Sequence, residues 1–135
     1  MRNKWAILGF AALVILATTA VFAATGKDAP EQITLDDCMS KKSAVEFPHG
    51  VHRKAYECKT CHHTQEGLTA ESTEEVQTCA SCHVNPEKAE TPACGEMSAK
   101  KNPFHILCID CHKTEAANHP DKALPTKCDQ CHPKA

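Results

Sequence analysis

The stretch Phe47-Pro48-His49-Gly50-Val51-His52, followed closely by Cys58-Lys59-Thr60-Cys61-His62-His63, contains the residues on which the fold of this chain depends. In its second part, two cysteines three positions apart lie on one side of a helical turn, and a histidine follows directly. The same Cys-x-x-Cys-His pattern occurs four times, with starts separated by 21, 29 and 20 residues, at Cys58–His62, Cys79–His83, Cys108–His112 and Cys128–His132. A motif repeated through the whole chain is the first feature to explain.

The repeated motif predicts four covalently attached c-type haems. Two sulfurs spaced in this way bond two carbons on one haem edge, and the adjacent histidine reaches the iron as an axial ligand. The predicted attachment residues are Cys58, Cys61, Cys79, Cys82, Cys108, Cys111, Cys128 and Cys131, and the predicted proximal ligands are His62, His83, His112 and His132.

Half of a zinc site and a dithiol redox centre also contain Cys-x-x-Cys. Neither of them requires a histidine after the second cysteine. The chain has nine His among 135 residues, so a histidine after all four pairs would arise by chance roughly once in 50,000. The sequence therefore favours haem, and a zinc-binding interaction module is the alternative.

The first 23 residues have the pattern of a secretory signal peptide: Met1–Lys4 is basic, an apolar run extends from Trp5 to Ala17, and small residues lead to Ala23. We expect cleavage after Ala23, which leaves one tetrahaem domain at residues 24–135. The alternative is an uncleaved membrane anchor, but the apolar run is short for a span, which needs about 20 residues. Export leads to an oxidising compartment.

The mature chain is poor in residues that build a core. Leu, Ile, Val and Phe number 13 of its 112 residues, about 12%, and below about 20% a chain usually does not fold by side-chain burial alone. Another group must therefore supply the core. The formal charge of the mature chain is −4, from 13 basic and 17 acidic residues. No basic run indicates nucleic acid, whereas an acidic body favours a basic protein partner.

Five histidines outside the motifs are candidates for the second axial position of the irons: His49, His52, His63, His105 and His119. An iron with two imidazole ligands has no open position for a substrate, and it favours electron transfer at low potential. Met39 and Met97 are alternative ligands, disfavoured by the supply of histidine. A reductase of a small anion, with one five-coordinate iron, is the competing function, and it requires one second ligand to be missing.

Cys38 and Cys94 belong to no motif, so in an oxidising compartment we expect them to form a disulfide. Three helix starts are also predicted. Asn102 before Pro103 begins a helix that runs towards His112. Ser72-Thr73-Glu74-Glu75 has capping-box spacing and opens a turn leading to Cys79, and Thr126 caps a short turn through Cys128.

The Phe-x-His-x-x-His element at Phe47–His52, the doubled histidine His62-His63 and the four motifs strongly resemble the cytochrome c3 family over nearly the whole mature chain. The resemblance implies a mainly α and irregular small domain, in which short helices and a little N-terminal strand wrap around four c-type haems. It also implies the ligand pairs, which are His62 with His49, His83 with His63, His112 with His52, and His132 with His105. His119 is then spare. On a helix, His105 shares a face with Cys108 and His112, which favours it over His119.

All four motifs have the two-residue spacer and the chain is acidic, which makes it similar to the acidic, type II branch of the family. That resemblance implies a periplasmic electron carrier, not an enzyme. Its partners would be a soluble, basic tetrahaem cytochrome reduced by hydrogenase, and a membrane-bound redox complex with which it associates. Four lysines near the last two motifs are either a small docking patch or ordinary solvated residues: Lys113, Lys122, Lys127 and Lys134.

Overall fold

The computed structural model describes residues 24–38 and 41–134. The expected signal peptide, residues 1–23, and Met39 lie outside the described residues. Short elements separated by long irregular segments make up the chain, in the order β1 (Ile33–Leu35), β2 (Val45–Phe47), α1 (His49–Ala55), η1 (Cys58–Thr60), α2 (Cys79–His83), η2 (His105–Ile109), α3 (Asp110–Asn118) and α4 (Cys128–Cys131). None of the described helices has the length and apolar character that crossing a membrane requires.

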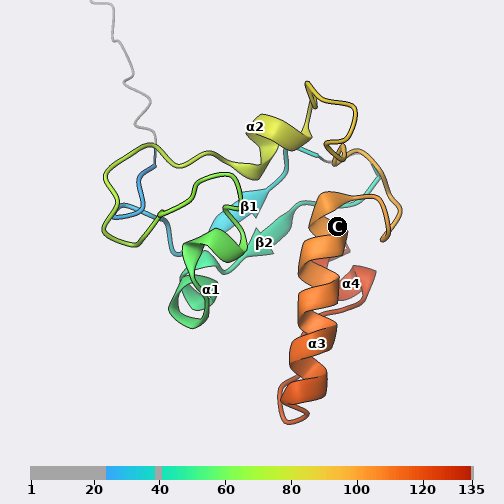
Figure 1. Ribbon diagram of the computed structural model, residues 1–135. Coiled ribbons are helices and arrows are strands. Elements are labelled where there is room, and N and C mark those ends of the chain that lie inside the picture. Colours follow the sequence, from blue (N-terminus) through green and yellow to red (C-terminus); the bar gives the residue numbers. More distant parts are fainter. Residues whose placement is uncertain (1–23, 39–40, 135) are drawn as a thin grey trace, which may run out of the picture.

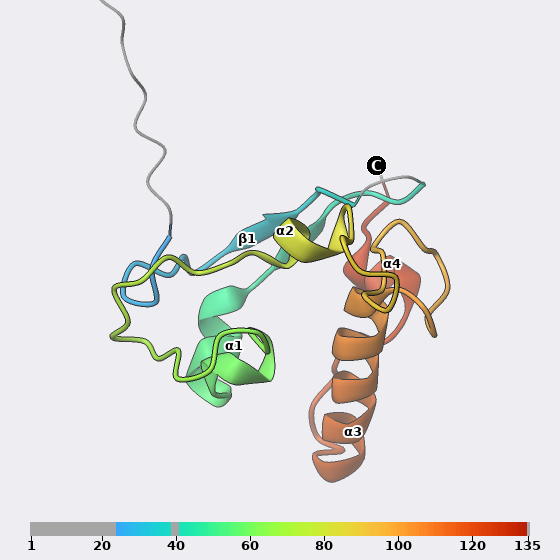
Figure 2. The same ribbon diagram turned by 45° about the horizontal axis from the view of Figure 1, so that its top comes forward.

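The two strands form a small antiparallel sheet in which Ile33 lies opposite Phe47 and Leu35 lies opposite Val45. Figures 1 and 2 show α1 near the end of this hairpin where β2 finishes, and α3 with α4 near its opposite end. Helix α1 begins directly after β2, so the strand holds the start of the helix in place. Short helices with a small two-stranded sheet are the fold class that the sequence predicted.

The described chain has almost no apolar core. Leu68 and Cys94, with 6% and 4% of their surface exposed, are its only buried hydrophobic residues, and none of its side chains is less than 2% exposed. A domain usually gains its stability by burying apolar side chains against each other. The structure therefore agrees with the expectation that the interior of this protein is supplied by something other than side chains.

A disulfide joins Cys38 to Cys94, across 56 positions of the sequence, and confirms the predicted pairing. It fastens the segment after β1 to the loop that follows α2. The backbone N–H of Cys94 donates a hydrogen bond of 2.8 Å to the carbonyl of His83. The disulfide thus stabilises the end of α2 against the N-terminal hairpin.

The predicted start of a helix at Asn102 is confirmed. The buried Asn102 side chain accepts hydrogen bonds from the backbone N–H groups of Phe104, at 2.9 Å, and His105, at 3.2 Å. Its amide group donates to the carbonyls of Cys94, at 2.6 Å, and Glu96, at 2.7 Å. The turns that follow differ from an ordinary helix, because η2 is a π-helix. In a π-helix each residue turns through a smaller angle around the helix axis than in an α-helix. The side chains of His105 and Cys108 therefore leave the helix in more widely separated directions than they would on an α-helix.

The two other predicted helix starts were wrong. Helix α2 begins at Cys79, and the preceding Thr78 is its N-cap, whose hydroxyl accepts from the N–H of Ser81 at 3.3 Å. Ser72 instead accepts from the N–H of Thr69, at 3.0 Å, and Glu75 lies in an isolated bridge with Thr25, so this segment is extended and not a capping box.

Helix α4 is capped differently from the prediction as well. Lys127 and not Thr126 is the residue before its first turn. The side-chain oxygen of Gln130 accepts hydrogen bonds of 3.0 Å from the N–H groups of both Thr126 and Lys127. The long side chain of Gln130 therefore reaches back from inside the helix and caps its start, where the sequence predicted the hydroxyl of Thr126.

Candidate functional site

Eight histidine rings lie together in four pairs, and each pair joins one motif histidine to one histidine outside the motifs. The distances between ring centroids are 6.4 Å for His49–His62, 6.1 Å for His52–His112, 6.1 Å for His63–His83 and 6.3 Å for His105–His132. These are the same pairs that the resemblance implies. The two members of a pair are 13 positions apart in the sequence for His49–His62, 20 for His63–His83, 27 for His105–His132 and 60 for His52–His112.

The separation of the rings fits one metal ion between each pair. A metal–imidazole bond is about 2.0 Å long and the nitrogen lies about 1.1 Å from the ring centre, so two rings on opposite sides of one ion have centroids about 6.2 Å apart. Among the described residues, no group of three or more His, Cys, Asp or Glu side chains is placed to hold a metal ion. Two ligands alone suit a metal whose other ligands come from a planar macrocycle, as in haem.

Helix α1 carries two of the non-motif histidines three positions apart, and they serve different pairs. Phe47, the last residue of β2, lies against His52 with ring centroids 4.5 Å apart and near His49 at 6.0 Å. An aromatic ring at this distance holds the neighbouring imidazole in place by packing. The Phe-x-His-x-x-His spacing therefore positions two histidines at the end of one short strand.

Helices η2 and α3 also carry histidines of two pairs. The ring of His105 lies edge-on to His132, with 90° between the planes, whereas His112 faces His52 at 33°. The predicted shared face assumed an α-helix. The π-helical winding between the two residues turns His105 away from Cys108 and towards His132 of the fourth motif.

Hydrogen bonds to backbone carbonyls fix the tautomer of most of these rings. The Nδ1 atoms of five of them lie 2.7–3.0 Å from a carbonyl oxygen, in the pairs His49–Pro30, His52–Pro48, His83–Pro92, His112–Pro125 and His132–Ser43. A carbonyl only accepts, so each Nδ1 must carry a proton and donate it. In the neutral form of such a ring, Nε2 is the unprotonated atom and can bind a metal.

The sequence did not reveal these carbonyl partners. Four of the five belong to prolines, which lack an N–H but keep an ordinary carbonyl, and nothing in the sequence marks that carbonyl as an acceptor. The ring of His62 has its own hydrogen bond to the backbone of Gln77. Burial nevertheless lowers the pKa of His62, and the nearby rings of His49 and His63 lower it further, which favours the neutral form that binds metals.

All eight motif cysteines are free thiols, and only Cys38 and Cys94 are paired. The pKa of Cys108 is raised to about 11, mostly by burial and to a smaller extent by the neighbouring Cys61, Cys131, Cys79 and Cys111. Thiols from the other three motifs therefore lie near Cys108.

Raised pKa values also weigh against a dithiol redox centre at these cysteines. Burial is the largest cause of the raised pKa of Cys61, Cys79 and Cys131 as well. A dithiol redox centre needs a lowered thiol pKa. Neutral thiols in an interior without apolar side chains fit residues that become thioethers.

His119 lies apart from these pairs. It follows α3, with its Nε2 atom 3.9 Å from a carboxylate oxygen of Glu115, and its side chain is 49% exposed. Glu115 also accepts a hydrogen bond from Tyr56, which raises the pKa of that phenol and ties the segment before the first motif to α3. Met97 is 51% exposed.

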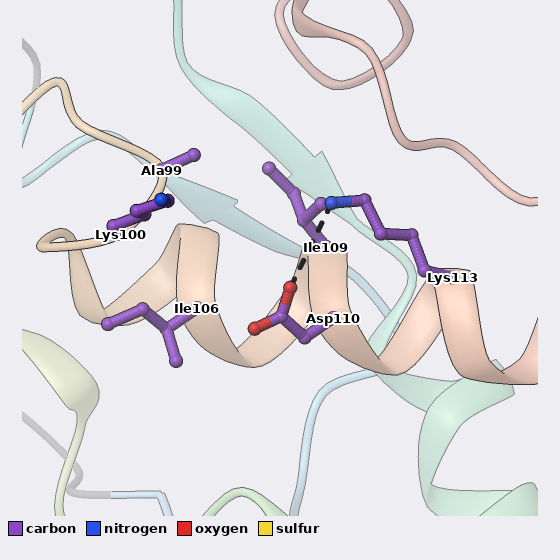
Figure 3. A pocket seen from close by; sticks show the side chains of 6 residues that line it. All are labelled: Ala99, Lys100, Ile106, Ile109, Asp110 and Lys113. Carbon is purple, nitrogen blue, oxygen red and sulfur yellow. Dashed lines mark ion pairs between the residues drawn. The ribbon is translucent and has the colours of Figure 1, made fainter.

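A hollow beside η2 and α3 is separate from the ring pairs. Figure 3 shows Ile106, Asp110 and Lys113 along one side of the helix, and the other residues that line the hollow are Ala99, Lys100 and Ile109. None of these is a motif cysteine or a paired histidine. Lys113 lies 4.0 Å from Asp110, so one of the four predicted patch lysines is partly neutralised by its own helix.

Comparison with known proteins gives a family match over most of the chain. Residues 23–132 match the sequence profile of the class III cytochrome c family. A cytochrome c3 of Desulfovibrio desulfuricans is 35% identical over 95 residues, 69% of this chain and 81% of that protein. A cytochrome c3 of Maridesulfovibrio salexigens is 35% identical over 119 residues, 79% of this chain and 97% of that protein.

A longer protein is also similar. The high-molecular-weight cytochrome c of Nitratidesulfovibrio vulgaris is 29% identical over 109 residues, which cover 79% of this chain but 16% of that protein. The match is thus to one part of a larger chain, whereas the two shorter relatives are covered over most of their length.

Proposed function

The chain belongs to the class III cytochrome c family, whose members are multihaem electron-transfer proteins with covalently bound c-type haem, and from this premise we propose that it is a periplasmic carrier with four bis-histidine haems. The observation that carries the proposal is the set of four histidine pairs with ring centroids 6.1–6.4 Å apart. Four pairs and four Cys-x-x-Cys-His motifs match in number, and each pair contains one motif histidine.

Each residue of the site has one role in this proposal. The two cysteines of each motif would hold the haem through thioether bonds, and the motif histidine and its paired ring would both bind the iron. The backbone carbonyls hold the rings in orientation through Nδ1 and increase their basicity. When bound, the haem iron supplies a one-electron change between ferric and ferrous states. With two imidazoles bound, the iron would have no position left for a substrate, so the role of the protein would be electron transfer alone.

The chain connects neighbouring sites through short segments. His62 and His63 are adjacent in sequence and belong to the first and second sites, and His49 and His52 on α1 belong to the first and third. Helices η2 and α3 carry ligands of the third and fourth sites. Such short connections hold the four sites close together, which is what transfer of electrons from one to the next requires.

Composition and charge support the finer parts of the proposal. We place the mature protein at residues 24–135, after removal of a signal peptide, and assign it to the acidic, type II branch. Its acidic surface fits a basic tetrahaem cytochrome, reduced by hydrogenase, as electron donor. A membrane-bound redox complex of anaerobic respiration would then be the acceptor. Redox protein partners in general follow from the family.

An intact mass of the natively exported protein tests the proposal. We expect residues 24–135 plus four haems, less two hydrogens for the Cys38–Cys94 disulfide. A protein with fewer haems would contradict the count, and a colourless protein would favour the zinc-binding module.

Ligand binding tests the coordination. We expect the reduced protein not to bind carbon monoxide quickly at neutral pH, because both axial positions are filled. Rapid binding to one haem would mean an open iron and would favour the reductase.

A further inference from the structure

One buried polar side-chain atom in the described part of the chain has no hydrogen-bond partner, and it is Nδ1 of His105. The exposed area of this atom is under 1 Å², so water does not reach it. A buried donor without a partner is unfavourable, because it loses its bond to water and gains none in the protein. The hydrogen bonding around the ring of His105 therefore needs to be compared with that around the other seven rings.

The other rings of the site differ from His105 in this respect. Five donate Nδ1–H to a carbonyl oxygen at 2.7–3.0 Å. His62 lies near the backbone of Gln77, and His63 is an exposed residue. Of the eight rings, His105 alone has a buried Nδ1 atom without a hydrogen-bond partner.

A hydrogen bond from Nδ1 to a carbonyl moves electron density into the imidazole and strengthens its donation to the metal. Stronger donation stabilises the ferric state more than the ferrous state and lowers the reduction potential. A ring without this bond donates less. The haem that it holds is then easier to reduce.

We propose that the missing acceptor at His105 gives the haem between His105 and His132 the highest reduction potential of the four, so that electrons collect at this site. The inference rests on the proposed function, because it requires both rings to be ligands. It adds to the proposed function the identity of the haem that carries the electron when the protein is partly reduced.

The pair His49–His62 provides an internal reference. Its centroid distance and interplanar angle, 6.4 Å and 85°, are nearly those of His105–His132, 6.3 Å and 90°. Ring orientation is therefore matched between the two sites. Each site has one ring whose Nδ1 donates to a carbonyl, His49 at the first and His132 at the other. They differ in the second ring, because His105 has the buried Nδ1 atom without a partner.

A redox titration of the intact tetrahaem protein, followed by NMR with signals assigned to each haem, tests the inference directly. We compare the haem of the His49–His62 pair, the first, with that of the His105–His132 pair, the fourth. At the solution potential where the first haem is half reduced, we expect the ferrous-to-ferric ratio of the fourth to be at least tenfold higher. This ratio corresponds to a reduction potential at least 59 mV higher for one electron. An equal or lower ratio at the fourth haem would overturn the proposal.

Two matched variants test the cause. Replacing His49 with Met removes a ring that donates to Pro30, whereas His105→Met removes a ring without a partner. We expect His49→Met to raise the potential of its own haem more than His105→Met raises that of its haem. A larger rise for His105→Met would show that Nδ1 bonding does not set the difference.

The wild-type protein provides a measurement that does not depend on the variants folding. In the reduced, ¹⁵N-histidine-labelled holoprotein, we expect the Nδ1–H proton of His105 to resonate upfield of those of the five carbonyl-bonded rings. A shift within their range would contradict the missing acceptor. If the spectra showed a haem without two histidine ligands, the proposed function would fail instead, so the two failures are distinguishable.

Discussion

At the scale of single residues, Asn102 makes more hydrogen bonds than any other side chain described here as a helix cap. It accepts from two N–H groups at the start of the helix and donates to two carbonyls near the disulfide. It is 7% exposed, so water cannot replace these partners. One side chain thus joins the helix that carries His105 to the loop around Cys94.

Replacing Asn102 with Ala should lower the free energy of unfolding of the holoprotein by about 2–4 kcal/mol, because a cap is lost and two buried carbonyls lose their donor. Denaturant titration measures this change. Thr114→Ala is the control, since its exposed hydroxyl bonds only to the carbonyl of Asp110, and we expect a change of about 0.5 kcal/mol or less. Equal effects of the two variants would contradict a central role for Asn102.

At the scale of elements, the helices are short and depend on caps and neighbouring segments for their stability. Helix α4 has four residues, Cys128–Cys131, too few to be stable by propensity alone. The Gln130 side chain satisfies two N–H groups before its first turn. This helix carries both attachment cysteines of the fourth motif and places His132 directly after them.

Replacing Gln130 with Ala should therefore fray α4, at a cost of about 1 kcal/mol. We expect faster hydrogen exchange at the N–H of His132, which donates to the carbonyl of Cys128 at 2.7 Å. Asp129→Ala, at an exposed position of the same helix, serves as the control. Unchanged exchange in Gln130→Ala would show that haem attachment alone holds the turn.

The elements also show where sequence reasoning was sufficient. The start at Asn102 was predictable because an Asn-Pro pair is a local signal, and the local chain makes the bonds. The starts of α2 and α4 were missed because competing partners lie nearby: Glu75 pairs with Thr25, and Gln130 reaches back over Thr126. The π-turn at η2 had no signal in the sequence that we could recognise.

At the scale of the whole molecule, we expect the disulfide and the haems to supply the stability that a hydrophobic core usually provides. Replacing both Cys38 and Cys94 with Ser should destabilise the holoprotein by about 4 kcal/mol by the chain-entropy model for a loop of this length. Thermal unfolding of the variant against the wild type measures the loss. A melting temperature within about 1 °C of the wild type would show that the haems constrain the same segments without the bridge.

The charge of the whole molecule predicts how it meets a partner. Binding to a basic tetrahaem cytochrome should weaken as salt rises from 10 to 300 mM, because exposed charges are screened beyond a Debye length of about 10 Å at 0.1 M. Replacing the exposed Glu71 and Glu74 with Gln should reduce the salt dependence of binding, because it removes negative charge. Replacing the exposed Lys41 and Lys42 with Gln is the control, and it should not reduce this dependence, because it removes positive charge. Salt-independent association would count against electrostatic steering.

The sequence by itself determined the features that depend on neighbouring residues and on composition. Four Cys-x-x-Cys-His motifs predict haem attachment because the spacing that presents two sulfurs and an imidazole is local. A mature chain with 13 Leu, Ile, Val and Phe residues predicts a missing core, and the structure has two buried hydrophobic residues among those described. The two cysteines left outside the motifs predicted their own disulfide.

Only the tertiary structure decided which carbonyl faces each ring, and which ring has none. The acceptors of His49, His83, His112 and His132 lie 19, 9, 13 and 89 positions away in the sequence. Every residue has a backbone carbonyl of the same chemistry, so no residue type identifies these acceptors. The unpartnered Nδ1 of His105 is likewise a property of packing: it depends on what three-dimensional folding leaves beside the ring, which no local pattern records.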